Sequence, residues 1–291
     1  MNLVQAINTY LWVWLETLKG FRRPAVILPF LVFGTLEALL LWSSAHFYQA
    51  PFGYFWIPVL EWIPGRAATH YPQYYLLLSR LLQNLDLVLS ALVGSITVGW
   101  GVLVFRGAYL SQPGALGQGL SGALRRAGAL VLIGVVVSLA TLLLSVGLGS
   151  LTLVPALRDW LVGSPMRQMA LQFVFNVALQ AALIYIPVVL LLSERGLLAA
   201  FGEGLGFFWR HRVMSLLLVA LPFAALIPLS VTLNRPQVLA ERFRPETIFT
   251  LCQLNIALAA LVSLLLTGAV VRFYLYRTRQ DRPAATQEAR S

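Results

Sequence analysis

Charged side chains and motifs of known chemistry are scarce in this chain. Only 11% of its 291 residues are Asp, Glu, Lys or Arg, against 59% hydrophobic residues. Ordinary soluble domains carry about 25% charged residues, so this class is excluded. A single cysteine, Cys252, excludes an internal disulfide framework. The sequence also lacks His-Glu-x-x-His and Gly-x-Ser-x-Gly segments, a lysine-bearing P-loop and a cysteine pair, so we expect no catalytic site, metal site or cofactor.

Long apolar runs dominate the chain instead. Six intervals of more than twenty residues hold at most one acidic residue each: 25–46, 76–104, 127–157, 168–193, 213–234 and 247–271. A helix needs about 20 residues to cross ~30 Å of hydrocarbon. We therefore predict an all-α, polytopic membrane protein with six transmembrane helices, which form a single integral membrane domain over residues 1–280. Residues 281–291 are polar, and we expect them to form a disordered cytoplasmic tail.

The basic residues between the apolar runs predict the orientation of the chain. Fourteen of them fall on the side of the termini, and seven fall on the other side. Because cytoplasmic segments carry the excess of Arg and Lys, we expect both termini to lie in the cytoplasm, with the protein in a bacterial inner membrane. The net charge of +10 is then explained by the membrane, and we expect no nucleic-acid partner.

The segment GQGLSG, residues 117–122, has the Gly-x-Gly-x-x-Gly pattern of a dinucleotide-binding loop. Such a loop follows a strand and precedes an acidic residue by about 20 positions, whereas here an apolar span precedes it and residues 138–145 contain no acid. The segment instead recurs, 85 residues later at 200–211 and 102 residues earlier at 16–23. We therefore predict three repeats of a surface helix plus an antiparallel helix pair, over residues 1–106, 107–193 and 194–278.

Each copy of the repeated segment carries an apolar stripe at helical spacing. The stripes comprise Ile7, Leu11, Trp14 and Leu18 in the first copy, Leu116, Leu120 and Leu124 in the second, and Leu198, Phe201, Leu205 and Phe208 in the third. Helices of this kind lie along the membrane surface with their apolar side in lipid, although the glycine-rich second copy is also compatible with an irregular loop. We expect their basic ends to contact lipid headgroups, through Arg23, Arg125, Arg126, Arg210, His211 and Arg212. We attribute the glycines to close packing against neighbouring spans.

Polar residues inside the spans are the candidate functional residues. Glu37 lies near the middle of the first span, and Asp86 lies in the outer half of the second, at a similar depth. An ionisable group in hydrocarbon costs at least about 2.5–3.5 kcal/mol, so both acids should face the bundle interior or water. Gln172 and Asn176 share one face of the fourth span. These four residues form either an intramembrane polar site or hydrogen bonds that hold helices together.

Residues 186–221 carry a combination of features that points to a family. Pro187 lies inside a span, Glu194 and Gly196 lie at its cytoplasmic end, and an amphipathic segment follows. The segment resembles the recurring unit of bacterial membrane proteins related to the membrane domain of glycerophosphodiester phosphodiesterases. The resemblance implies their membrane architecture. It implies no phosphodiesterase activity, because the soluble catalytic barrel is absent from this sequence.

Two classes of function remain open. We favour a non-catalytic inner-membrane protein, a partner-binding or lipid-organising subunit of a membrane assembly. Its partners would be membrane lipids and either another membrane protein or a second copy of the chain. The alternative is a transporter or permease subunit that uses Glu37 and Asp86, although the third and fifth spans offer few polar residues for a pathway. The aromatic-rich segment 47–75 fits an aromatic belt at headgroup depth or, in a functional interpretation, a docking surface for a lipid or partner.

Overall fold

The computed structural model describes residues 3–62, 73–112, 114–150, 165–193, 195–233, 235, 239 and 241–280. Throughout this part of the chain the regular elements are helical. Six helices are long and apolar enough to cross a membrane, which confirms the predicted multi-pass, all-helical class. They are Leu28–Ala45, Leu78–Tyr109, Ala127–Gly147, Arg167–Leu192, Arg212–Leu233 and Glu246–Thr278. The expected tail at 281–291, Glu194 and parts of the loops between spans lie outside the described residues.

The first half of the chain contributes a surface helix, two spans and a short outer helix. In order it forms α1 (Leu3–Gly20), the 3-10 turn η1 (Pro24–Val26), α2 (Leu28–Ala45), α3 (Phe52–Trp62), α4 (Gln73–Leu89), the π-helical turn η3 (Ser90–Gly94) and α5 (Ser95–Tyr109). Since α4, η3 and α5 follow one another without a gap, they make one long second span. The π-helical turn inserts an irregularity of a kind that is frequent at functional sites.

The second half repeats the alternation of short and long helices. It forms α6 (Ala115–Arg125), α7 (Ala127–Ser150), α9 (Pro165–Leu183), α10 (Tyr185–Leu192), α11 (Leu197–Arg210), α12 (Arg212–Leu233) and α14 (Pro245–Gln280). The fourth span divides into α9 and α10 at Ile184. Pro187 accounts for this break, because it has no N–H to donate to the carbonyl of Leu183 four residues earlier.

The six spans are arranged as an inner group and an outer group. The helices that end the second, fourth and sixth spans, α5, α10 and α14, all pack against one another. Each remaining span packs between two neighbours, α2 between α5 and α14, α7 between α5 and α9, and α12 between α9 and α14. The outer position of α7 agrees with its composition, because it is almost wholly apolar and little of it is buried inside the bundle. The core is therefore built mainly by the inner group.

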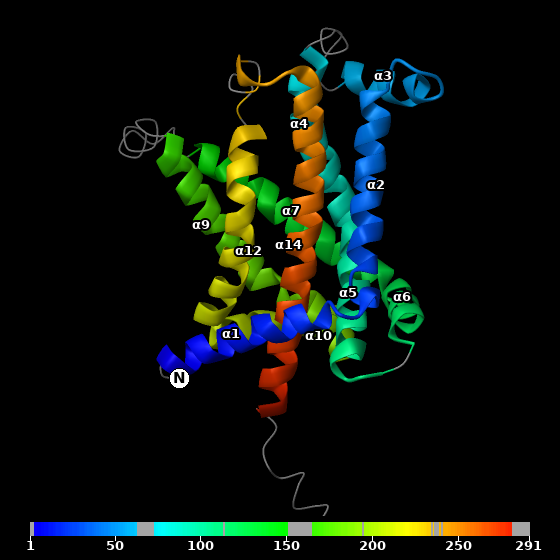
Figure 1. Ribbon diagram of the computed structural model, residues 1–291. Helices are drawn as coiled ribbons and strands as arrows, with labels where there is room; N and C mark the ends of the chain where they lie inside the picture. Colours follow the sequence, from blue (N-terminus) through cyan, green and yellow to red (C-terminus); the bar gives the residue numbers. More distant parts are fainter. Residues whose placement is uncertain are drawn as a thin grey trace, which may run out of the picture.

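Three short helices, α1, α6 and α11, lie at one end of the bundle, here called the surface-helix end. Figure 1 shows α1 lying across this end beside α14 and α10, with α6 beside the end of α5. Each of the three packs on the end of an inner span, α6 on α5, α11 on α10 and α1 on α14. The chain thus brings its first helix against its last span, although the two are more than 200 residues apart.

Two glycines allow surface helices to pack closely on inner spans, Gly119 in α6 against α5 and Gly204 in α11 against α10. A Cβ at Gly119 would lie 3.0 Å from Val104, and a Cβ at Gly204 would lie 3.1 Å from the backbone nitrogen of Ile186. Close packing therefore accounts for these two positions, as predicted. Gly117, Gly202 and Gly206 have nothing within 4 Å, so packing does not explain them.

The apolar stripes of the surface helices are only partly exposed. In α1 the exposed residues are Ile7, Leu11, Leu15 and Leu18, whereas Trp14 is half-buried. In α11 Leu198 is 87% exposed, but Phe208 at the other end of the predicted stripe is only 8% exposed and belongs to the core. The predicted stripe of α11 is therefore wrong at Phe208, because this helix packs closely on α10 and turns its second half into the bundle.

Candidate functional site

The two predicted intramembrane acids come together in the structure. Glu37 on α2 is only 5% exposed, and the Asp86 carboxyl group on α4 is close enough to interact with its carboxyl group. Asp86 itself is exposed, and its Oδ1 accepts a hydrogen bond of 2.8 Å from Ser90 Oγ. One acid thus lies inside the bundle while its partner reaches the bundle surface.

Neighbouring helices support this acid pair from two sides. Ser90 is the first residue of the π-helical turn η3, so the hydroxyl that binds Asp86 stands where the second span departs from α-helical geometry. From the sixth span, Gln253 Nε2 donates a 3.3 Å hydrogen bond to the carbonyl of Ala38, the residue after Glu37. The pair therefore lies where three spans, α2, the second span and α14, come together.

The predicted amides of the fourth span are placed elsewhere. Gln172 is exposed and Asn176 is half-buried, both on α9, which packs against α7 and α12. Within the described residues, no hydrogen bond joins either amide to Glu37 or Asp86. The four-residue polar site is therefore reduced to the two acids.

A polar surface on α4 was missed by the sequence analysis. Arg80, Asn84 and Asp86 are all exposed and lie on the second span. All three lie inside the interval 76–104 and Asp86 was a predicted site residue, but nothing in the pattern said which face of the helix would be covered. Arg80 and Asn84 are four residues apart and share one face of the helix, whereas Asp86, two residues after Asn84, points about 200° away from it. We call Arg80 and Asn84 the polar face of α4.

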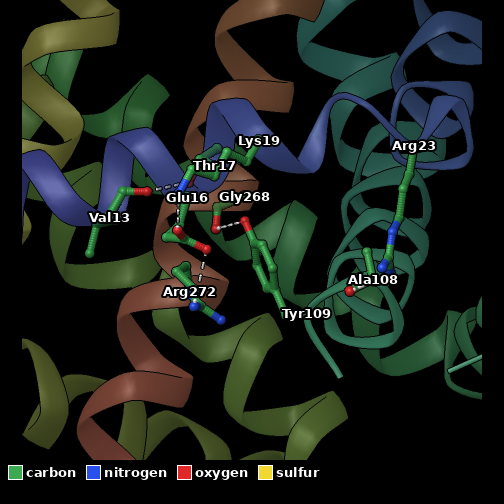
Figure 2. Close-up of polar contacts among 9 residues, drawn as sticks. All are labelled: Val13, Glu16, Thr17, Lys19, Arg23, Ala108, Tyr109, Gly268 and Arg272. Carbon is green, nitrogen blue, oxygen red and sulfur yellow. Dashed lines mark hydrogen bonds and ion pairs between the residues drawn. The ribbon is translucent and has the colours of Figure 1, made fainter. Parts of the chain in front are cut away.

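Figure 2 shows how α1 is held at the surface-helix end. Glu16 on α1 pairs with Lys19 at 2.8 Å and with Arg272 on α14 at 3.3 Å. The guanidinium of Arg272 also lies over the rings of Trp12 and Tyr109, 4.6 Å and 5.0 Å from their centroids. The hydrogen bond from Lys19 lowers the pKa of the Glu16 carboxyl group, and the charge of Arg272 acts in the same direction. Glu16 is therefore ionised and shared between two cations at neutral pH.

The residues predicted to contact lipid headgroups fall into two groups. Arg125, Arg210 and Arg212 are exposed, as headgroup contacts require. The others bind protein atoms, and of these only Arg23 is also exposed. Arg23 donates to the carbonyl of Ala108 at 2.5 Å, Arg126 donates to that of Leu190 at 2.7 Å, and His211 packs its ring on Phe207 and Phe273. Contact between protein segments is thus a main role of this second group.

The acid pair makes a direct prediction. In a Cys252→Ala background, cysteines at Glu37 and Asp86 should be joined by a short bismaleimide, because its linker spans the gap left when two neighbouring carboxyl side chains are shortened to cysteine, whereas a direct disulfide needs Cα atoms within about 7 Å. Cysteines at Ser44 and Tyr74 are a positive control between the same helices, since Tyr74 Oη donates to the Ser44 carbonyl. Cysteines at Leu39 and Asp86 are a negative control, because Leu39 is 57% exposed on another face of α2. If the cysteines at Ser44 and Tyr74 were crosslinked but those at Glu37 and Asp86 were not, the contact between the two acids would be contradicted.

The fold and its polar surfaces define a multi-pass helical membrane protein. No protein-family model, curated protein or solved structure matches the chain. Among the described residues, no group of three or more His, Cys, Asp or Glu side chains is placed to hold a metal ion.

Proposed function

We propose that the chain is a non-catalytic subunit of a membrane assembly that binds another membrane-embedded protein through the polar face of α4. The observation that carries this proposal is the exposure of Asn84, on the same helix face as exposed Arg80, within a transmembrane span. Lipid tails offer no hydrogen-bond partner to an amide or a carboxyl group. Polar side chains at this depth are normally covered by another helix or by water.

The depth of these residues supports the proposal. Glu37 is near the middle of the 18-residue helix α2, and Asp86 contacts it. Asn84 is two residues from Asp86, or about 3 Å along the helix axis. Both exposed polar groups therefore lie well inside a hydrocarbon core ~30 Å thick. By contrast, the exposed residues of α7, such as Leu139 and Leu143, are apolar and suit lipid.

The proposal is tested by the size of the complex in mildly solubilised native membranes. Replacing Asn84 by leucine removes an exposed amide without disturbing the core, so the purified chain should keep its thermal stability. The complex should be weakened about threefold, because an interhelical hydrogen bond contributes about 0.6 kcal/mol on average. Leu143→Ala on α7 is the matched control and should leave the complex intact. A wild-type chain that migrates as a monomer would contradict the proposal.

The contact between Glu37 and Asp86 favours a second candidate, a carrier that moves a proton or cation. Two carboxyl groups can hydrogen bond only when one keeps its proton, because an ionised carboxylate only accepts. A proton held in mid-membrane is the kind of group that proton relays use. Proteoliposomes with the wild-type chain should then acidify in response to an imposed gradient, and Glu37→Gln should abolish the flux. Equal flux in empty vesicles would remove this candidate.

We further propose that the protein lies in a bacterial inner membrane with both termini in the cytoplasm, and that it consists of three repeats. The excess of basic residues on the side of the termini supports the orientation. The packing of α1, α6 and α11 each on an inner span supports the repeats, and so does the resemblance to the phosphodiesterase membrane domains. A reporter active only in the cytoplasm should work when fused at residue 115 and fail at residue 160; the reverse pattern would contradict the orientation.

A further inference from the structure

The N-terminal helix α1 has two apolar faces. Its inward face holds Val13 and Thr17, which are both fully buried against the bundle. Its outward face carries Ile7, Leu11, Leu15 and Leu18, which are 48–58% exposed. Such a helix can stay on the membrane surface through its outward face whether or not its inward face is docked on the bundle. Undocking therefore leaves half of its apolar surface covered by lipid.

The polar contacts that dock α1 on α14 converge on one side chain. Arg272 binds the carboxylate of Glu16 and lies over the ring of Trp12, both on α1. Elsewhere α1 reaches α12 through a long hydrogen bond, 3.5 Å, from Tyr10 Oη to the Leu217 carbonyl. The side chains of Arg272 and Glu16 are 22% and 25% exposed, so anions from the surrounding surface have access to the pair.

Anionic phospholipid is the natural competitor for these cations. Arginine binds phosphate in the same bidentate geometry as carboxylate, and Lys19, Arg22 and Arg23 at the end of α1 are exposed and attract an anionic surface. In the docked state Glu16 forms ion pairs with both Lys19 and Arg272. In an undocked state Glu16 keeps Lys19, which lies on the same helix, whereas Arg272 becomes open to phosphate, and this gives the lipid a higher affinity for that state.

We infer that α1 exchanges between a docked and an undocked position on the membrane surface, that Arg272 holds the docked position, and that anionic phospholipid headgroups favour the undocked one. Undocking uncovers the buried side chain of Thr17 and the segment of α14 around Gly268. A Cβ added at Gly268 would lie 2.7 Å from the methyl group of Thr17, so the docked α1 packs directly on this glycine. The surface-helix end would thereby report the anionic lipid content of its leaflet.

The test measures the accessibility of Thr17 in nanodiscs. A Thr17→Cys chain in the Cys252→Ala background is exposed to an uncharged, membrane-impermeant maleimide, in discs of phosphatidylcholine alone or of equal parts phosphatidylcholine and phosphatidylglycerol. Labelling should be slow in the neutral lipid. It should be at least about tenfold faster with the anionic lipid, because phosphate competes with Glu16 for Arg272 and the docked state then loses a charge-assisted pair. Arg272→Gln and the milder Glu16→Gln should each make labelling fast in neutral lipid.

The control is Asn8→Cys, an exposed position of α1 outside the Glu16–Arg272 contact, and its labelling should be fast in all of these samples. Equal labelling of Thr17→Cys in the two lipids, with the control unchanged, would overturn the role of anionic lipid. Slow labelling that persists in both Arg272→Gln and Glu16→Gln would overturn the role of Arg272.

Discussion

Replacing Gly134 by alanine should strongly destabilise the protein. A Cβ at this position of α7 would lie 2.4 Å from the carbonyl oxygen of Ala91 and 2.8 Å from the Cβ of Ser95. Both neighbours belong to the second span, and the closest atom is backbone, which cannot turn aside. Overpacking of this kind costs about 1–3 kcal/mol or more. We expect a clear fall in the thermal midpoint of the detergent-purified chain, with lower yield from membranes.

The matched control is Gly128→Ala on the same helix. Nothing lies within 4 Å of a Cβ there, so the substitution should be neutral or slightly stabilising, because alanine favours a helix over glycine by about 1 kcal/mol. Equal midpoints for the Gly134 and Gly128 variants would show that α7 does not approach the second span as described.

Replacing Arg126 by glutamine should also destabilise the bundle. Its guanidinium donates to the carbonyls of Leu190 and Arg195, at 2.7 Å and 3.0 Å, where the fourth span ends. Carbonyls in the last turn of a helix have no partner within the helix, and a cation there also interacts favourably with the helix dipole. Hydrogen bonds from a charged group contribute about 1.5–3 kcal/mol. The thermal midpoint should therefore fall, whatever the lipid composition.

Arg125→Gln is the comparison that separates protein contact from lipid contact. Arg125 is exposed, so its loss should leave the midpoint in detergent unchanged and should reduce only the stabilisation that anionic lipid provides, by about 1 kcal/mol. If both variants behaved alike in detergent, Arg126 would have no special role in joining the two spans.

The membrane spans were predictable because length and apolar composition decide them locally. An interval such as 213–234 has no charged residue, and the structure forms α12 over Arg212–Leu233. Lipid leaves no alternative to a helix for such a run, since every backbone group must be satisfied internally. Counting residues along antiparallel spans predicted similar depths for Glu37 and Asp86, and the structure brings the two carboxyl groups close enough to interact.

The remaining features depend on which distant segments pack together. Glu16 and Arg272 form their pair across 256 positions of the chain, and no local pattern says that the first helix meets the last span. The same holds for Arg126, whose sequence neighbourhood suggested lipid, whereas its partners come from the end of another span. Exposure of Asn84 on the second span likewise depends on where α2 and α14 pack against α4.

Photo-crosslinking in native membranes tests the central claim, that a membrane-embedded partner covers the polar face of α4. A photoreactive amino acid would replace Asn84 or, as the control, Leu143, which is 70% exposed on the apolar helix α7. Illumination should give a protein adduct of defined mass from position 84 and none from position 143. If position 84 gave only unreacted or lipid-linked protein, as at position 143, the polar face would have no protein partner and the account would be contradicted.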